Sequence, residues 1–85
     1  MEADQNRRGL ARLMLRMPAY RRRLQLLSVR SEEMRNLCGA FDDASSMLER
    51  LRRERDDHNA GMIAEYERLC SDIERDILIM CSEED

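Results

Sequence analysis

The sequence predicts an all-α protein built as an antiparallel helical hairpin. Two runs of apolar residues recur at alternating intervals of three and four, which is typical of helices that pack lengthwise as in a coiled coil. The first run is Met34, Leu37, Phe41, Ala44, Leu48 and Leu51. The second run is Ile63, Tyr66, Cys70, Ile73, Ile77 and Met80. The short polar stretch DDHNAG lies between them and favours a tight turn joining two antiparallel helices.

The composition agrees with this fold class. The chain has 85 residues, enough for one small domain. It contains one Phe, two Tyr and no Trp, so Leu, Ile, Met and Ala must form the core, and these residues suit helix packing better than a sheet. No window of five residues alternates between apolar and polar as a half-buried strand would.

The N-terminal segment, residues 1–17, is basic and amphipathic. Residues 1–6 are polar and are expected to fray, and Asn6 is expected to cap a short helix over residues 7–17. Gly9 should weaken this helix by about 1 kcal/mol relative to Ala. Met17 is also an alternative translation start, in which case the preceding residues would not belong to the protein.

The hairpin domain, residues 18–85, begins at Pro18, which suits the first turn of a helix. We expect this helix to run to about residue 57. A kink at Ser28–Ser31 is the alternative, but neither Pro nor Gly lies there. The second helix is expected over residues 61–81, after a turn in which Asn59 or Gly61 adopts positive φ.

The two helices differ in length, so the second leaves part of the first uncovered. Three apolar residues, Tyr20, Leu24 and Leu27, lie in that part. Leu69 and Leu78 lie off the seam of the second helix and widen its apolar surface. These five residues are the predicted partner-binding residues. Either the N-terminal helix folds back over the open end or a second chain covers it, which predicts a three-helix or a dimeric four-helix bundle.

The charge distribution is asymmetric although the net charge is only −3. Residues 1–31 carry eight Arg and two acids, a balance of +6, whereas residues 32–85 carry seven Arg and sixteen acids, a balance of −9. The simplest interpretation is that the halves attract each other. The alternative is nucleic-acid binding, in which phosphates contact the N-terminal arginines. The candidate residues are Arg12, Arg16, Arg21, Arg22 and Arg23.

A cationic amphipathic segment is also typical of membrane-surface helices and targeting peptides. No Trp or Phe anchors it, however, and Glu2 and Asp4 are unusual in a transit peptide. No uncharged apolar run is long enough to cross a membrane. Three Cys without a CxxC motif or a secretory signal favour a reducing, cytoplasmic location.

Catalytic and cofactor motifs are missing from the sequence. His58 is the only histidine and lies in the expected turn, and there is neither a Gly-rich phosphate loop nor a set of spaced metal ligands. We therefore expect no enzymatic activity, no cofactor and no metal. Cys38 and Cys81 are expected near each other at the open end of the hairpin, where a disulfide or redox role is the alternative to simple packing.

These observations favour a small non-catalytic intracellular interaction or regulatory protein. It would act through helix–helix contacts with a helical partner or, as a homodimer, with a second copy. The alternative is the nucleic-acid-binding protein described above. If the first hypothesis holds, the N-terminal arginines should pair with acids, for which Asp72, Glu74 and Asp76 are candidates.

Overall fold

The computed structural model describes residues 2–54 and 57–83, and all of its regular elements are helical. In chain order they are α1 (Glu2–Arg16), the 3-10 turn η1 (Pro18–Tyr20), α2 (Arg21–Arg30), α3 (Glu32–Glu54), the 3-10 turn η2 (Asp57–Asn59) and α4 (Ala60–Glu83). The described residues include no strand, so the all-α prediction is confirmed. None of these helices combines the length and the apolarity needed to cross a membrane.

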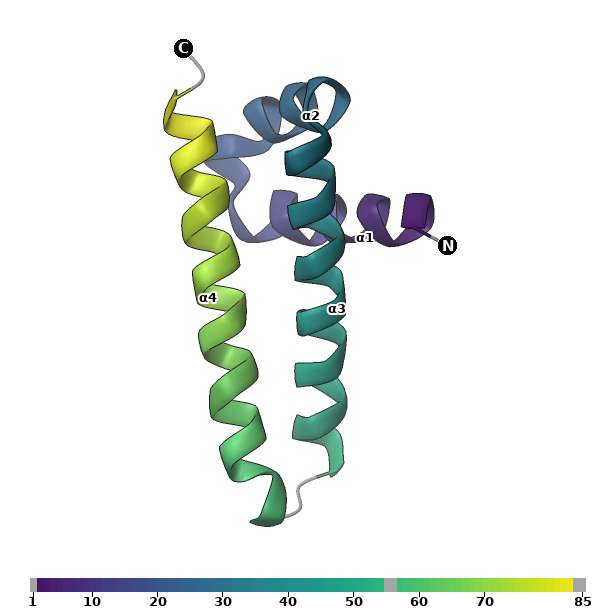
Figure 1. Cartoon of the computed structure of the whole chain (residues 1–85), viewed down its shortest axis with the longest axis vertical. Coiled ribbons are helices and arrows are strands. Elements are labelled where there is room, and N and C mark those ends of the chain that lie inside the picture. The colour runs from purple at the N-terminus through teal and green to yellow at the C-terminus, as the bar shows by residue number, and fades with distance from the viewer. Residues whose placement is uncertain (1, 55–56, 84–85) are drawn as a thin grey trace.

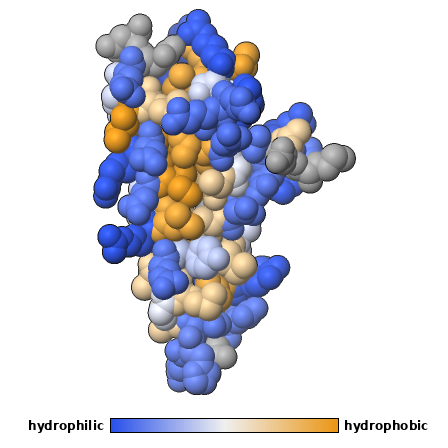
Figure 2. Space-filling view, in the orientation of Figure 1, coloured by the Kyte–Doolittle hydropathy of each residue, from blue (hydrophilic) through white to orange (hydrophobic). Residues whose placement is uncertain are grey.

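The two long helices, α3 and α4, lie side by side and run in opposite directions (Figure 1). The predicted seam residues face each other in the core, where Phe41 and Leu48 of α3 pack with Ile73 and Ile77 of α4. On one side of the pair, apolar side chains reach the surface as a band in the upper and middle part of the view (Figure 2). The band is narrow because polar residues border it on both sides.

Helix α1 crosses α3 at a steep angle, and α2 closes the end of the α3–α4 pair (Figure 1). The helix begins at Glu2, so residues 2–6 are helical and do not fray as predicted. Asn6 is therefore inside the helix and does not cap it. Leu13 of α1 has no exposed surface and belongs to the core, so α1 packs against the other helices.

The prediction of one continuous helix from residue 18 to 57 is wrong, because the helix is interrupted at Ser31. Ser31 has an extended backbone (φ −116°, ψ 118°), and its Oγ accepts a hydrogen bond from the N–H of Met34 at 3.0 Å. This is an N-cap, and Glu32 and Glu33 follow it in the first turn of α3, where negative charge is favourable. The end of α2 is held by Arg35, whose Nη1 donates to the Ser28 and Val29 carbonyls.

The turn between α3 and α4 lies where the sequence predicted it, but one detail differs. The described turn, η2, ends at Asn59, and α4 begins at Ala60. Of the two residues predicted to allow a positive φ, Asn59 and Gly61, Gly61 lies inside α4 and does not adopt it. Residues 55–56, within the predicted end of the first helix, lie outside the described residues.

Candidate interaction site

Two glycines allow α1 and α3 to cross in close contact. A Cβ built on Gly9 of α1 would overlap the backbone carbonyl of Cys38 in α3. A Cβ built on Gly39 of α3 would overlap Oδ1 of Asn6 in α1. The crossing therefore requires that positions 9 and 39 carry no side chain. This crossing was not predicted from the sequence, because Gly9 was considered there only as a residue that weakens the first helix.

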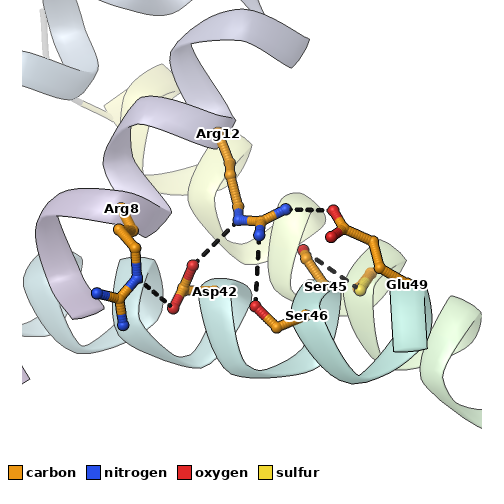
Figure 3. Close-up of polar contacts among 7 residues, drawn as sticks. Arg8, Arg12, Asp42, Ser45, Ser46 and Glu49 are labelled. Atoms are coloured by element: carbon orange, nitrogen blue, oxygen red, sulfur yellow. Dashed lines mark hydrogen bonds and ion pairs between the residues drawn. The ribbon is translucent and has the colours of Figure 1, made fainter. Parts of the chain in front are cut away.

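Charged side chains join the two helices beside this crossing (Figure 3). Asp42 of α3 is only 3% exposed, and its carboxylate accepts hydrogen bonds from Arg8 Nε at 3.4 Å and Arg12 Nε at 3.0 Å. The Nη1 of Arg12 donates to Glu49 Oε1 at 2.6 Å, and its Nη2 donates to Ser46 Oγ at 3.4 Å. Asp42 thus has two cationic partners from one neighbouring helix.

The hydrogen bond between Arg12 and Glu49 favours the charged form of both side chains. The hydrogen bond to Glu49 raises the pKa of Arg12, burial opposes the rise, and Asp42 adds to it. The same hydrogen bond lowers the pKa of Glu49. A general acid or base needs a pKa near the working pH, whereas these shifts move both values away from neutrality. The network is suited to holding α1 on α3.

The other predicted nucleic-acid residues do not form one free surface with Arg12. Arg16 makes an ion pair with Glu74 of α4 at 3.0 Å, as expected if the two halves of the chain attract each other. Arg23 donates to the backbone carbonyl of Cys81 at 3.3 Å. Arg21 and Arg22 are exposed and make no ion pair with the acids of the described part of the chain.

The three thiols are buried and free. Burial, together with the nearby Cys81, raises the pKa of Cys38 to about 11. Burial also raises the pKa of Cys81, and Arg23 opposes this effect. Both thiols are therefore protonated at neutral pH, which makes them poor nucleophiles.

The remaining polar candidates do not assemble into a metal site. His58 is exposed on η2, at the opposite end of the α3–α4 pair from α2 (Figure 1). Among residues 2–54 and 57–83, no three His, Cys, Asp or Glu side chains are grouped so that they could hold a metal ion.

A shallow apolar groove lies between α3 and α4, and we call it the α3–α4 face. Its lining residues are Ala40, Asp43, Ala44 and Met47 of α3 and Tyr66, Leu69 and Ile73 of α4. Helical phase places Ala40 and Met47 far around α3 from Asp42, which contacts α1, so the face points away from α1. Figure 2 shows the apolar band of this side. Leu69 is 44% exposed in the groove.

Acidic side chains border the α3–α4 face, and we call them the acidic rim. They are Glu33 and Asp43 of α3 and Glu65, Asp72, Asp76 and Glu83 of α4. All six are exposed. On α4 the intervals are seven, four and seven, which keeps the row on one side of that helix.

The predicted partner-binding residues are only partly where the sequence placed them. Leu24 and Leu27 are buried in the core of the chain itself, so the predicted open face at Tyr20–Leu27 is wrong. The reason is that α2 packs against α1, α3 and α4. Tyr20 and Leu78 are half-buried, and only Leu69 is exposed.

Sequence reasoning missed the α3 side of the face. Ala40 and Met47 belong to a second row of apolar residues at alternating intervals of three and four, starting at Leu37 and passing through Ala44. This second row was the sequence signal that could have revealed the α3 side of the face. It was overlooked because two of its residues, Leu37 and Ala44, also belong to the seam. The exposed apolar residues of the N-terminal half, Leu15, Leu26 and Val29, were also not predicted.

Comparison of the chain with protein-family models, with curated proteins and with solved structures finds no match. The fold and its surfaces therefore define a small all-α protein with an apolar groove between its two longest helices. Acidic side chains border this groove.

Proposed function

We propose that this protein is a non-catalytic interaction protein that binds a helical partner at the α3–α4 face. The observation that carries the proposal is the exposure of Leu69, in a groove whose other lining residues are mainly apolar. Apolar surface of this kind gains free energy when a partner removes it from water. Grooves between paired helices are a common binding site for an amphipathic helix.

The polar side chains support an interaction role over catalysis. Arg12, Asp42 and Glu49 are engaged with one another across the α1–α3 crossing. The raised pKa values of Cys38 and Cys81 disfavour a thiolate nucleophile at neutral pH.

A homodimer is one form of this proposal. Two copies joined through their α3–α4 faces would make a dimeric four-helix bundle, the arrangement expected from the sequence. Such a dimer would bury Leu69 and Met47 of both copies. Sedimentation velocity at tens of micromolar tests this form, because a monomer at that concentration contradicts it.

Nucleic-acid binding is less well supported. Arg16 is engaged with Glu74, Arg12 is engaged with Glu49, and Arg23 bonds a backbone carbonyl, so phosphates would compete with intramolecular partners. A gel-shift comparison of the wild type with a variant in which Arg21, Arg22 and Arg23 are changed to Ala tests it. We expect no difference, and a loss of binding in the variant would favour nucleic acid.

The binding face can be tested in the native cell by site-specific photo-crosslinking. A benzophenone amino acid at Leu69 should give an adduct of defined mass, whereas the same group at the exposed Arg53 of α3 should not. Ala40→Arg, on the opposite wall of the groove, should abolish the Leu69 adduct. Equal adducts from both positions, or none from Leu69, would contradict the proposal.

A further inference from the structure

We infer that the occupant of the α3–α4 face is a basic amphipathic helix, in which a row of apolar side chains is bordered by Arg or Lys. The inference rests on the proposed function, since it names the partner class for the same face. It is carried by the shape of the groove and by the charge that surrounds it.

The groove has the form of a helix-binding site. On α4 the groove is lined by Tyr66, Leu69 and Ile73. Met62 and Met80 continue the apolar row on the same side of the helix, and the whole row spans about 27 Å at 1.5 Å per residue. A partner helix of about 18 residues would match that length. On the α3 side the groove is lined by the small side chains of Ala40 and Ala44, which let a helix backbone approach closely.

The acidic rim determines which helix fits. On the α4 side, Leu69 is flanked by Glu65 and Asp72 at helical spacing, and both are exposed. On the α3 side, Asp43 lines the groove itself. A partner must therefore place its flanking side chains among carboxylates, and cationic side chains are favoured there.

Basic residues offset this charge only in part. Arg50 lies seven residues after Asp43, on the same side of α3, and is exposed. Arg75 lies 3.9 Å from Asp72, but it is 72% exposed and makes only a weak pair. At the α2 end of the α3–α4 pair, a second hollow is lined by Arg30 together with Glu33, Asp76 and Glu83. That end therefore carries more negative than positive charge.

The same charge argues against the other occupants. Two copies meeting face to face would bring two acidic rims together, and like charges across an interface are unfavourable. Nucleic acid and anionic lipid would be repelled for the same reason. A basic amphipathic helix would place its apolar side chains in the groove and its cationic side chains beside the acidic rim.

Two designed peptides test the inference on the full chain. The first is an 18-residue helix of Leu and Lys, with Leu at i, i+3, i+4 and i+7, and the second keeps the same Leu positions but replaces Lys with Glu. Fluorescence anisotropy should show that the Leu–Lys peptide binds at least about tenfold more tightly, with an affinity that falls as salt rises. Amide chemical-shift changes should map its binding to Ala40, Met47 and Leu69.

Matched variants separate a specific site from general attraction between opposite charges. The first variant combines Asp43→Asn, Asp72→Asn and Asp76→Asn in the acidic rim. The control combines Asp4→Asn, Asp57→Asn and Glu67→Gln, which changes the net charge equally but leaves the rim intact. The rim variant should lose about tenfold in affinity for the Leu–Lys peptide and the control should not. Equal losses would overturn the inference.

The remaining outcomes distinguish the inference from the proposed function. Equal binding of both peptides at the face would overturn the basic partner while leaving the proposed function in place. A dimer that Leu69→Asp dissociates would identify a second copy as the occupant, with the same consequence. A monomer that binds neither peptide would overturn both. Circular dichroism of every variant shows whether the fold is retained.

Discussion

Gly9 of α1 lies directly against the backbone of Cys38 in α3, so closely that a Cβ on Gly9 would overlap the Cys38 carbonyl oxygen. The overlapping atom belongs to the backbone of a packed helix and cannot rotate away as a side chain can. The docking of α1 onto α3 therefore requires glycine at this position. The cost of glycine to α1 as an isolated helix is offset by the contact that it permits.

Gly9→Ala should destabilise the protein. Alanine favours a helix by about 1 kcal/mol over glycine, but the overlap with Cys38 forces α1 away from α3, and overpacking of this kind costs about 1–3 kcal/mol or more. Urea unfolding followed by circular dichroism should show a lower midpoint.

Gly61→Ala is the matched control for this change. Gly61 is also in a helix, but a Cβ there would meet open space. The substitution should therefore stabilise the protein, by at most about 0.5–1 kcal/mol because Gly61 is only the second residue of α4. If Gly9→Ala stabilises the protein as Gly61→Ala does, the close crossing described above is wrong.

Leu13 should contribute strongly to stability although it lies in the segment predicted as separate from the hairpin. Its side chain has no exposed surface, so Leu13→Ala should cost about 2–5 kcal/mol by loss of burial and creation of a cavity. Leu15, two residues away, is 77% exposed, and Leu15→Ala should change stability by no more than about 0.5 kcal/mol. Equal effects in thermal unfolding would show that α1 does not belong to the core.

The sequence predicted the α3–α4 seams because each is a periodic pattern within a single helix. Phe41 and Ile77, for example, are buried as their spacing indicated. The break at Ser31 also had a local signal, Ser followed by two Glu, but it was outweighed by the absence of Pro and Gly. An N-cap hydrogen bond can end one helix and begin the next without either residue.

The position of α1 could not be predicted in the same way. Its crossing with α3 depends on Gly9 and Gly39, which are 30 positions apart, and on a carboxylate from Asp42 that lies beside them. No periodicity links such residues. The α3–α4 face was half predicted, through Leu69, and its α3 side was hidden because Ala40 is small and Ala44 already belonged to the seam.

Asp42 should be more important for stability than the adjacent Asp43. Asp42→Asn removes the charge that Arg8 and Arg12 contact, and a lost hydrogen bond to a charged group costs about 1.5–3 kcal/mol. Both arginines retain access to water, which favours the lower end of this range. Asp43→Asn, at an exposed position, should change stability by no more than about 0.5 kcal/mol.

High salt provides an independent check on this pair of variants. Screening weakens the attraction between Asp42 and its arginines, so the difference between Asp42→Asn and wild type should narrow as salt rises. Urea unfolding at low and high salt measures that difference. A similar cost for both substitutions would mean that Asp42 is not held as described.

Cys38 should make the protein less stable at high pH. Burial raises its pKa to about 11 in the folded state, above an unfolded value of about 9. Below pH 9 the thiol is protonated in both states, so its contribution to stability is fully present. As the pH rises from 9 to 11, the unfolded chain releases the proton first, and the free energy of unfolding falls by about 2–3 kcal/mol.

Cys38→Ala isolates this contribution, because alanine fits the site and does not titrate. The variant should keep the fold and lose less stability than wild type between pH 9 and 11. Some loss should remain, since burial also raises the pKa of Cys81. Urea unfolding at a series of pH values gives the two slopes to be compared. Parallel slopes for wild type and Cys38→Ala would show that the Cys38 thiol reaches water in the folded state, contrary to its burial at the α1–α3 crossing.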